Sequence, residues 1–225
     1  MPILNRVGLF GGTFNPIHFG HLRTALETLE GFGLDQIRFI PAADPPHKDK
    51  TDLADESDRL AMLTQAIENN PLFSVSDIEL RRPGRSYTID TVRQFTREKL
   101  PSTQCFLIIG LDAFMDISTW KEYKEILKNI PLIVMSRPDE NEPFMNRNFS
   151  GIGEYMENRI STGFVFNKEQ NAFVHKSLKP IYIFPVTSLH ISATTIRQHV
   201  RQGRSIRYLV PDSVATYIHD KRLYT

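Results

Sequence analysis

Short apolar runs alternate along this chain with segments whose apolar residues recur at helical spacing. Residues 6–10 (RVGLF) and 36–42 (QIRFIPA) have the pattern of short buried strands. The segment between them, residues 22–30, places leucine and alanine at i, i+3, i+4 and i+7, which predicts an amphipathic helix. We expect Gly31 and Gly33 to end that helix.

The same alternation continues along the chain. Further helices are predicted at residues 57–70 and 88–100, and further strands at residues 73–80, 105–110, 131–136 and 181–186. Uninterrupted apolar runs such as CFLIIG are typical of parallel strands that are covered on both faces. This order predicts a doubly wound α/β fold with a mainly parallel sheet, whose ligands lie beyond the carboxyl ends of the strands.

Residues 139–178 do not follow this alternation. Their composition is mixed and their period is unclear, apart from a short helical pattern at 152–160. Connections of this length are usually functional or mobile, and we interpret the segment as a surface insertion. The expected organisation is a core over residues 1–190 that includes this insertion, with a small C-terminal helical part over 191–225 packed on the same domain.

Composition limits the binding partners and the cellular compartment that we expect for this protein. The chain has 225 residues, with 27 basic and 26 acidic side chains, so no overall field favours nucleic acid or anionic lipid, and neither is an expected partner. The single Cys105 excludes an internal disulfide, which indicates a reducing compartment. No signal peptide or membrane-spanning run is visible, so we expect a cytoplasmic protein. Monomer and homo-oligomer both stay open.

Candidate chemistry is concentrated in GGTFNPIHFGHL, residues 11–22. We expect a strand ending at Phe10, a glycine turn, and a helix beginning near Phe19. Because glycine has no Cβ, backbone N–H groups at such a junction can approach a phosphate closely. Imidazoles at His18 and His21 would then stabilise charge that builds on that phosphate.

Each of these features alone has a simpler interpretation. Glycine turns after strands are common, and a His-x-x-His pair can bind zinc or cap a helix. Against zinc, the chain lacks companion cysteines and its other histidines lack ligand spacing, so no protein metal site is predicted. The phosphate loop of ordinary kinases and GTPases and the G-x-G-x-x-G motif are both absent. The conjunction of glycines and histidines at one strand-to-helix junction favours a functional site.

The H-x-G-H stretch resembles the signature of the nucleotidylyltransferase superfamily, and the chain as a whole is similar to the bacterial nicotinate-nucleotide adenylyltransferases. The motifs that carry this similarity are GTFNPIHFGHL, PPHK at 45–48, RRPGRSYTIDT at 81–91, GLDAFMDISTW at 110–120, SRP at 136–138, ISATTIR at 191–197 and the tail VPDSVATYIHDKRLY. Two residues depart from the pattern, since Asn15 replaces a frequent Asp and Ala193 a frequent Ser. Neither change removes a reacting group, because Asn makes the same turn-stabilising hydrogen bonds as Asp.

The resemblance implies a Rossmann-like core that transfers AMP from ATP to nicotinic acid mononucleotide, giving deamido-NAD and pyrophosphate in NAD biosynthesis. It also implies in-line attack without a protein nucleophile, with Mg²⁺ accompanying ATP as substrate. The catalytic residues implied are His18, His21 and Arg197. The ATP-binding residues implied are Gly11, Gly12, Thr13, Phe14, His18, His21, Gly110, Asp112, Ser192, Thr194 and Arg197.

Several assigned residues have structural alternatives. Ser192 is a good N-cap for the helix that follows it, and Arg197 fits a solvated helix face. Trp120, the only tryptophan, would either stack on a pyridine ring or pack in the core. Thr88 at a helix start would either cap that helix or face a nicotinate carboxylate. The resemblance assigns mononucleotide binding to Lys48, Thr88, Trp120 and Arg137.

Other activities share parts of this pattern. Adenylyltransferases for nicotinamide mononucleotide or pantetheine phosphate, and cytidylyltransferases, share the first motif, but we do not expect them to carry the stretches at 81–91 and 110–120. Class I aminoacyl-tRNA synthetases share the histidines, yet this chain is short and has no K-M-S-K-S-like stretch. The alternative from another class is a non-catalytic nucleotide sensor, which should have lost one of His18, His21 or Arg197.

Overall fold

The computed structural model describes residues 5–44, 52–97, 102–136 and 151–225. Its centre is a single eight-stranded sheet with the strand order β3-β2-β1-β4-β5-β8-β7-β6. The strands are β1 (Asn5–Gly12), β2 (Gln36–Pro41), β3 (Phe73–Val75), β4 (Thr103–Gly110), β5 (Leu132–Ser136), β6 (Val165–Asn167), β7 (Ala172–Val174) and β8 (Ile181–Pro185).

The sheet is parallel from β3 to β8 and antiparallel only at β7 and β6. On β1, Phe10 stands opposite Phe39 of β2 and Ile108 of β4. The chain runs outward from β1 through β2 to β3 and then returns to β4 on the other side of β1. The topological switch point therefore lies between β1 and β4, where doubly wound folds bind their ligands.

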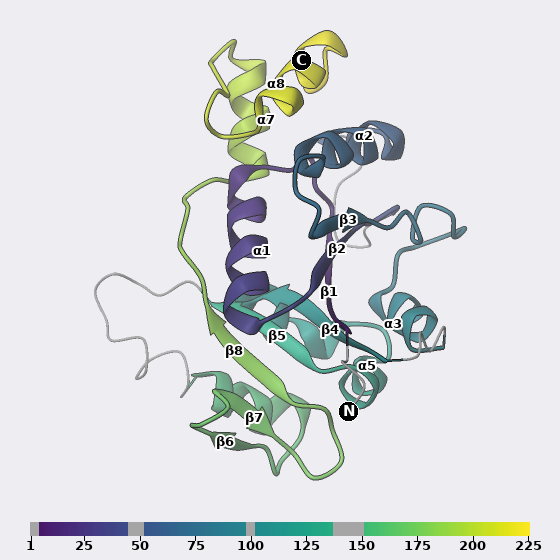
Figure 1. Cartoon of the computed structure of the whole chain (residues 1–225), viewed down its shortest axis with the longest axis vertical. Helices are drawn as coiled ribbons and strands as arrows, with labels where there is room; N and C mark the ends of the chain where they lie inside the picture. Colours follow the sequence, from purple (N-terminus) through teal and green to yellow (C-terminus); the bar gives the residue numbers. More distant parts are fainter. Residues whose placement is uncertain (1–4, 45–51, 98–101, 137–150) are drawn as a thin grey trace.

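Helices cover both faces of the sheet (Figure 1). They are α1 (Phe19–Phe32), α2 (Glu56–Ile67), α3 (Thr88–Arg97), α4 (Leu111–Met115), α5 (Tyr123–Asn129), α7 (Ala193–Arg201) and α8 (Asp212–Asp220). One buried cluster joins the sheet to α1, α2, α7 and α8, and a second joins it to α3, α4 and α5. The predicted doubly wound α/β class is confirmed.

Several predicted element boundaries are wrong. β1 continues to Gly12, because Gly11 and Gly12 pair in register with Ile40 and Pro41 of β2. The glycine pair is thus the end of a strand and not a turn. The predicted strand at 73–80 stops at Val75, and residues 78–81 form turns.

The helix α1 runs through Gly31, which was expected to end it, and closes at Gly33. Gly31 has a packing role instead. A Cβ at this position would lie 2.4 Å from the Phe184 ring of β8, so only glycine lets α1 approach the sheet this closely.

Residues 151–178, the described part of the expected insertion, contribute to the core. Residues 151–160 are helical, ending in the π-helical turn Met156–Ile160, and the hairpin of β6 and β7 extends the sheet beside β8. Ile152, Met156 and Phe173 are buried in the cluster that includes α3 and α5. This part of the segment widens the sheet, whereas residues 139–150 lie outside the described ranges.

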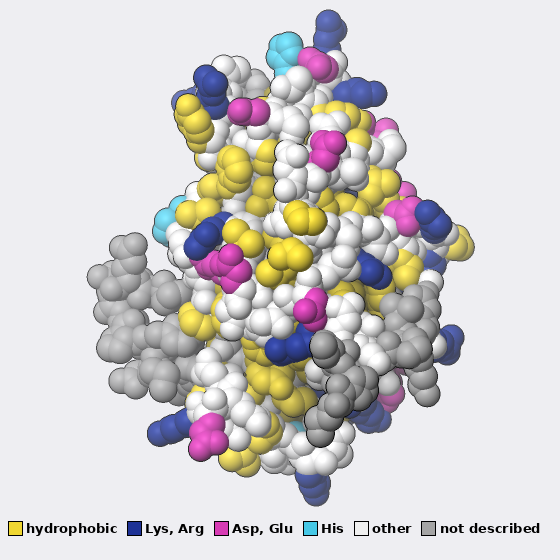
Figure 2. Space-filling view, in the orientation of Figure 1, with side chains coloured by type: hydrophobic (Ala, Val, Ile, Leu, Met, Phe, Trp, Pro, Cys, Tyr) yellow, Lys and Arg dark blue, Asp and Glu magenta, His cyan; other side chains and the backbone are white. Residues whose placement is uncertain are grey.

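The surface carries charges of both signs. Figure 2 shows lysine and arginine interspersed with aspartate and glutamate on the face it presents. Among the residues that the structure describes, no helix is long and apolar enough to cross a membrane.

Candidate active site

The connection from β1 to α1 brings two histidines together at the carboxyl edge of the sheet. His18 is the N-cap residue of α1, and His21 lies in the first turn. Their rings are stacked, with centroids 3.7 Å apart and planes inclined by 27°. His18 is buried, and His21 also packs edge-on against Phe14, with 5.2 Å between ring centroids. The predicted helix start near Phe19 is confirmed, and the two imidazoles lie side by side there.

The glycine between the histidines allows this stacking. A Cβ at Gly20 would lie 2.9 Å from Nδ1 of His18 and 3.6 Å from the Ile191 carbonyl oxygen. Real Cβ atoms do not approach a ring nitrogen that closely, so any larger residue would displace the imidazole. The glycine of the H-x-G-H signature is therefore required by the position of the His18 ring.

Replacing Gly20 by alanine should lower kcat by about tenfold or more, because a small displacement of a reacting group is costly in catalysis. The helix should tolerate alanine well, so the midpoint of thermal unfolding should change little. Steady-state kinetics and circular dichroism measure the two effects. Gly151→Ala is the matched control, since a Cβ there meets no atom within 4 Å. A wild-type kcat for Gly20→Ala would contradict this role.

A first cavity, of about 260 Å³, opens beside α1 and is called the His21 cavity. Its lining includes Gly20 and His21 from α1, and Gly110 and Asp112 from the junction of β4 and α4. Asp112 is exposed in the first turn of α4, so its carboxylate is accessible to a ligand. Three residues predicted to bind ATP, namely His21, Gly110 and Asp112, thus share one cavity.

A second cavity, of about 250 Å³, lies on the face of the sheet that carries α3 and is called the Trp120 cavity. Trp120 follows the short 3-10 helix Ile117–Thr119, and Thr88 begins α3, as predicted. The strand end of β1 lines the same cavity with Gly11, Gly12 and Thr13. The predicted phosphate cradle therefore faces the same space as the predicted pyridine-binding residues.

The two cavities share Phe10, which lies two residues before the end of β1, and Gly110, the last residue of β4. They lie on opposite faces of the sheet, because α1 lines one and α3 lines the other. A ligand with two ring systems joined by phosphates could occupy both cavities and cross the edge of the sheet between them. This edge is the topological switch point, as expected for the fold.

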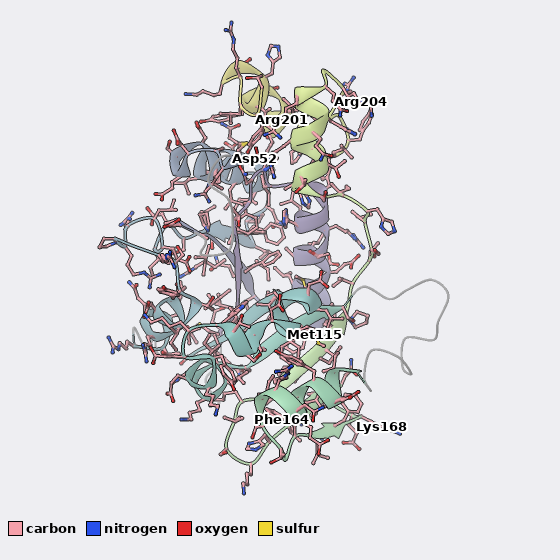
Figure 3. The ribbon with its side chains drawn as sticks, turned by 180° about the vertical axis from the view of Figure 1, so that it is seen from behind. Asp52, Met115, Phe164, Lys168, Arg201 and Arg204 are labelled. Carbon is pink, nitrogen blue, oxygen red and sulfur yellow. The ribbon has the colours of Figure 1, made fainter. Side chains whose placement is uncertain are left out.

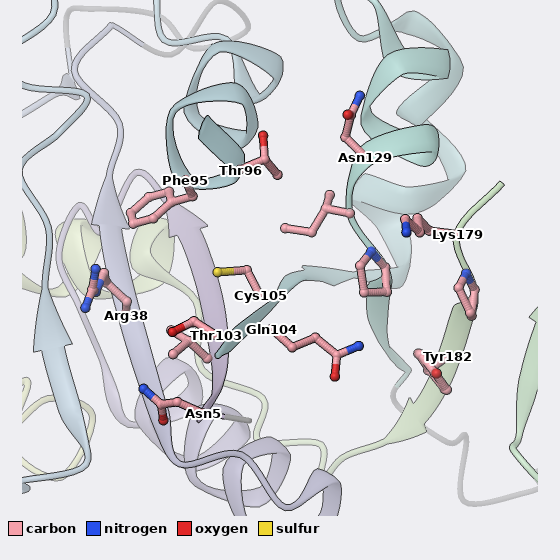
Figure 4. A pocket seen from close by; sticks show the side chains of 14 residues that line it. Asn5, Arg38, Phe95, Thr96, Thr103, Gln104, Cys105, Asn129, Lys179 and Tyr182 are labelled. Atoms are coloured by element: carbon pink, nitrogen blue, oxygen red, sulfur yellow. The ribbon is translucent and has the colours of Figure 1, made fainter. Parts of the chain in front are cut away.

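A larger cavity, of about 630 Å³, lies at the opposite edge of the sheet, where β1, β4 and β8 begin (Figure 4). Arg38, Gln104, Cys105 and Lys179 are among its lining residues, and none of the predicted site residues lies there. Burial raises the pKa of the Cys105 thiol, which keeps it protonated and unreactive. Size alone therefore does not identify the active site of this chain.

The start of α7 lies against the β1–α1 connection. Ser192 caps α7, as predicted, because its Oγ accepts a hydrogen bond from the Thr195 amide at 3.1 Å. Ser192 and Thr194 are both exposed. The capped helix start therefore stands open to solvent.

Arg197 does not lie on a solvated helix face, so that interpretation is wrong. Its side chain is only 13 % exposed, and Nη1 donates a hydrogen bond to the Asn15 carbonyl at 3.0 Å. Its Nη2 lies 3.7 Å from the Asp52 carboxylate, which also pairs with Arg201 (Figure 3). Arg201 and Arg197 together lower the pKa of Asp52. The guanidinium of Arg197 thus points at the loop that carries His18.

Lys48 and Arg137 lie outside the described residues, as does the PPHK motif at 45–48. Their binding of the mononucleotide stays a prediction. Among the described residues, no three His, Cys, Asp or Glu side chains lie in a group that could hold a metal ion.

Arg59 is a structural residue of the site that sequence reasoning missed. It is fully buried and donates hydrogen bonds to the carbonyls of Thr13 (2.9 Å), Ala42 (2.6 Å) and Ala43 (3.2 Å). Desolvation lowers its pKa from the usual value, yet a guanidinium stays charged in proteins. The sequence feature that could have indicated this burial is the position of Arg59 on the apolar face of α2, three residues before Met62. Arg59 fixes the chain just beyond β1 and β2.

Asn15 and the penultimate residue of the chain form a second missed contact. Asn15 is buried, and its Oδ1 accepts hydrogen bonds from the Tyr224 hydroxyl (2.7 Å) and the Ala54 amide (3.1 Å). Its Nδ2 donates to the Asp52 carbonyl at 2.7 Å. Burial raises the pKa of Tyr224, so its hydroxyl remains a donor. The C-terminal tail thereby holds the loop that leads to His18.

Tyr224→Phe should lower the free energy of unfolding by about 1 kcal/mol, the net contribution of one such hydrogen bond. Urea denaturation of wild type and variant measures the difference. The control is Tyr208→Phe, because Tyr208 is 77 % exposed and its loss of a hydroxyl should change stability little. Equal stability of the two variants would show that the Tyr224 contact adds nothing.

Known proteins match this chain over nearly its whole length. A family model described as cytidylyltransferase-like matches residues 9–199. Relatives named probable nicotinate-nucleotide adenylyltransferase occur in Geobacter metallireducens, 40 % identical over 98 % of both chains, and in Desulfatibacillum aliphaticivorans, 41 % identical over 97 % of this chain and 99 % of the relative. A solved structure of Plasmodium falciparum nicotinic acid mononucleotide adenylyltransferase complexed with NaAD has the same fold, with a TM-score of 0.69 and 17 % identity over 98 % of this chain and 97 % of that one.

Proposed function

The chain belongs to the nicotinate-nucleotide adenylyltransferase family, and from this premise we propose that it transfers AMP from ATP to nicotinic acid mononucleotide, giving deamido-NAD and pyrophosphate. The observation that carries the proposal is the pair of cavities joined at Phe10 and Gly110. We assign the adenylate to the His21 cavity and the pyridine ring to the Trp120 cavity. The phosphates then lie over the ends of β1 and β4, beside the two histidines.

The reaction needs positioning and charge stabilisation more than covalent chemistry. A phosphate oxygen of the mononucleotide attacks the α-phosphorus of ATP and forms a new P–O bond. The bond from this phosphorus to the oxygen bridging to the β-phosphorus breaks, and pyrophosphate leaves with the electron pair. His18 and His21 donate hydrogen bonds to oxygens whose charge grows in this transition state. Their stacked, packed rings are held in place before the substrates bind.

Positive groups complete the phosphate site. We assign the β- and γ-phosphates to the exposed start of α7 and to Arg197, which lies one turn after Ser192 and close to the β1–α1 connection. A divalent cation enters with ATP as part of the substrate, and we assign this role to Mg²⁺, which neutralises phosphate charge. The triphosphate supplies the principal ligands for this ion.

The Trp120 cavity suits the acid form of the ring. The first turn of α3 begins at Thr88, and backbone N–H groups at a helix start favour an anion such as the nicotinate carboxylate. The indole of Trp120 lines the same cavity and can stack on the ring. These two contacts support nicotinic acid mononucleotide as the acceptor.

Label transfer tests the proposed reaction. The chain is incubated with Mg²⁺, nicotinic acid mononucleotide, and ATP labelled at either the α- or the γ-phosphorus. We expect the dinucleotide to take label only from the α position and pyrophosphate only from the γ position. Transfer of γ-label to the mononucleotide would indicate a kinase, and the absence of any transfer would indicate a non-catalytic nucleotide sensor.

A further inference from the structure

The Trp120 cavity contains a buried carboxylate that the proposed mechanism does not use. Glu79 lies in the turn after β3, is 8 % exposed, and lines this cavity together with Thr88 and Trp120. Its Oε1 accepts a hydrogen bond from the Thr91 hydroxyl at 2.6 Å. Within the described ranges, no lysine, arginine or histidine nitrogen lies within 4.0 Å of this carboxylate.

The Arg82 guanidinium is linked to the Glu79 carboxylate only through the Thr91 hydroxyl. Arg82 donates from Nη2 to the Thr91 hydroxyl at 2.8 Å, so that hydroxyl lies between the guanidinium and the carboxylate. Buried carboxylates are normally paired with a cation or bound by several donors, because leaving water is costly for a charge. Glu79 accepts from one side-chain hydroxyl, and it is one of the residues that line the cavity. The cavity therefore favours a ligand that brings a positive charge.

The rest of the lining restricts the shape of that ligand. Side chains of Ile40, Val92, Leu107, Ile109 and Trp120 make much of the wall apolar. An ammonium group would leave its other N–H donors without partners against such a wall. A flat aromatic cation, whose charge is spread over carbon atoms, meets both the apolar wall and the carboxylate.

We propose that the Glu79 carboxylate binds the positive charge of a pyridinium ring in the Trp120 cavity. This rests on the proposed function, since nicotinic acid mononucleotide carries such a ring. The bound ring is a zwitterion, with its carboxylate at the start of α3 and its charged nitrogen towards Glu79. Acid and amide rings share the positive charge, so Glu79 attracts the ring nitrogen of both. Its charge also repels the nicotinate carboxylate, and the donors at the start of α3 must outweigh this repulsion for the acid to be preferred.

Glu79→Gln tests the role of the charge. Glutamine keeps the size of the side chain and an oxygen that accepts from Thr91, but it removes the negative charge. Isothermal titration calorimetry compares nicotinic acid mononucleotide with its 1,4-dihydro form, whose ring is neutral. We expect Glu79→Gln to weaken binding of the pyridinium form by about tenfold, as for loss of one charged partner, and not to weaken binding of the dihydro form, whose only ring charge is its carboxylate.

Two further variants separate the effect of the Glu79 charge from a structural effect of the substitution. Glu68→Gln removes the same charge at the exposed C-cap position of α2 and should change neither dissociation constant. Thr91→Val removes the hydrogen bond to Glu79 but keeps its charge, so the preference for the pyridinium form should persist. Circular dichroism confirms that each variant is folded.

Equal weakening of the pyridinium and dihydro forms by Glu79→Gln would mean that Glu79 only supports the cavity wall, and this would overturn the proposal. Unchanged binding of both forms would overturn it as well. The label-transfer experiment on the wild type reports on the proposed function separately. If the wild type forms the dinucleotide and Glu79→Gln keeps the wild-type ring preference, the assignment of Glu79 alone fails.

Discussion

His21→Ala lowers kcat by about 10²- to 10³-fold and leaves the fold intact, because the transition state loses a preorganised hydrogen-bond donor. The ring of His21 lines the cavity assigned to the adenylate and stacks on His18 with centroids 3.7 Å apart. Alanine is the best helix former, so the first turn of α1 keeps its backbone. Turnover at saturating ATP and mononucleotide gives kcat, and thermal unfolding reports on the fold.

His219→Ala is the control for this experiment. His219 lies near the end of α8, and its side chain is 90 % exposed. Its removal should leave kcat at the wild-type value. A folded His21→Ala protein with the kcat of wild type would remove His21 from the mechanism.

Wild-type protein uses the acid mononucleotide at least about 10²-fold better than the amide, measured as kcat/KM, because the amide leaves buried donors unmatched. In the proposed complex, the nicotinate carboxylate accepts hydrogen bonds from the Thr88 hydroxyl and the first N–H groups of α3. The amide would present its NH₂ donor to these donors. Stacking on Trp120 acts on both rings alike, and Glu79 attracts the ring nitrogen that both share.

Two variants divide this preference into its parts. Thr88→Val should narrow the ratio of kcat/KM values by about tenfold, since it removes one donor to the carboxylate. Trp120→Ala should weaken both substrates to a similar extent, because it removes stacking that both rings share. Equal use of acid and amide by the wild type would remove the specificity assignment and leave adenylyl transfer standing.

Much of the fold followed from the sequence where an element showed a clear period, but the short helices α4 and α5 were not predicted. The strands β4, β5 and β8 contain uninterrupted apolar runs, β1 and β2 have the pattern of short buried strands, and α1 has apolar residues at helical spacing. The strands β6 and β7, of three residues each, were missed because the segment around them shows no clear period, whereas the equally short β3 was found from a longer pattern that overran it. Their place in the sheet depends on pairing with β8, which is a tertiary contact.

The site was predictable where a local rule applied. The two histidines at the start of α1 and the cap at Ser192 follow from the chemistry of helix starts, and the structure confirms both positions. The hydrogen bond from Tyr224 to Asn15 joins residues 209 positions apart, so no local pattern could reveal it. The strand-end glycines Gly11 and Gly12 line the Trp120 cavity and not the His21 cavity. This placement also depends on which face of the sheet each helix covers.

The most direct test is a competition among acceptors. The protein is incubated with ATP, Mg²⁺ and equal concentrations of nicotinic acid mononucleotide, nicotinamide mononucleotide and pantetheine phosphate, and the products are identified by mass spectrometry. We expect deamido-NAD to be the predominant product, formed in equal amount with pyrophosphate. Predominant formation of NAD or dephospho-coenzyme A, or ATP left intact, would contradict the account.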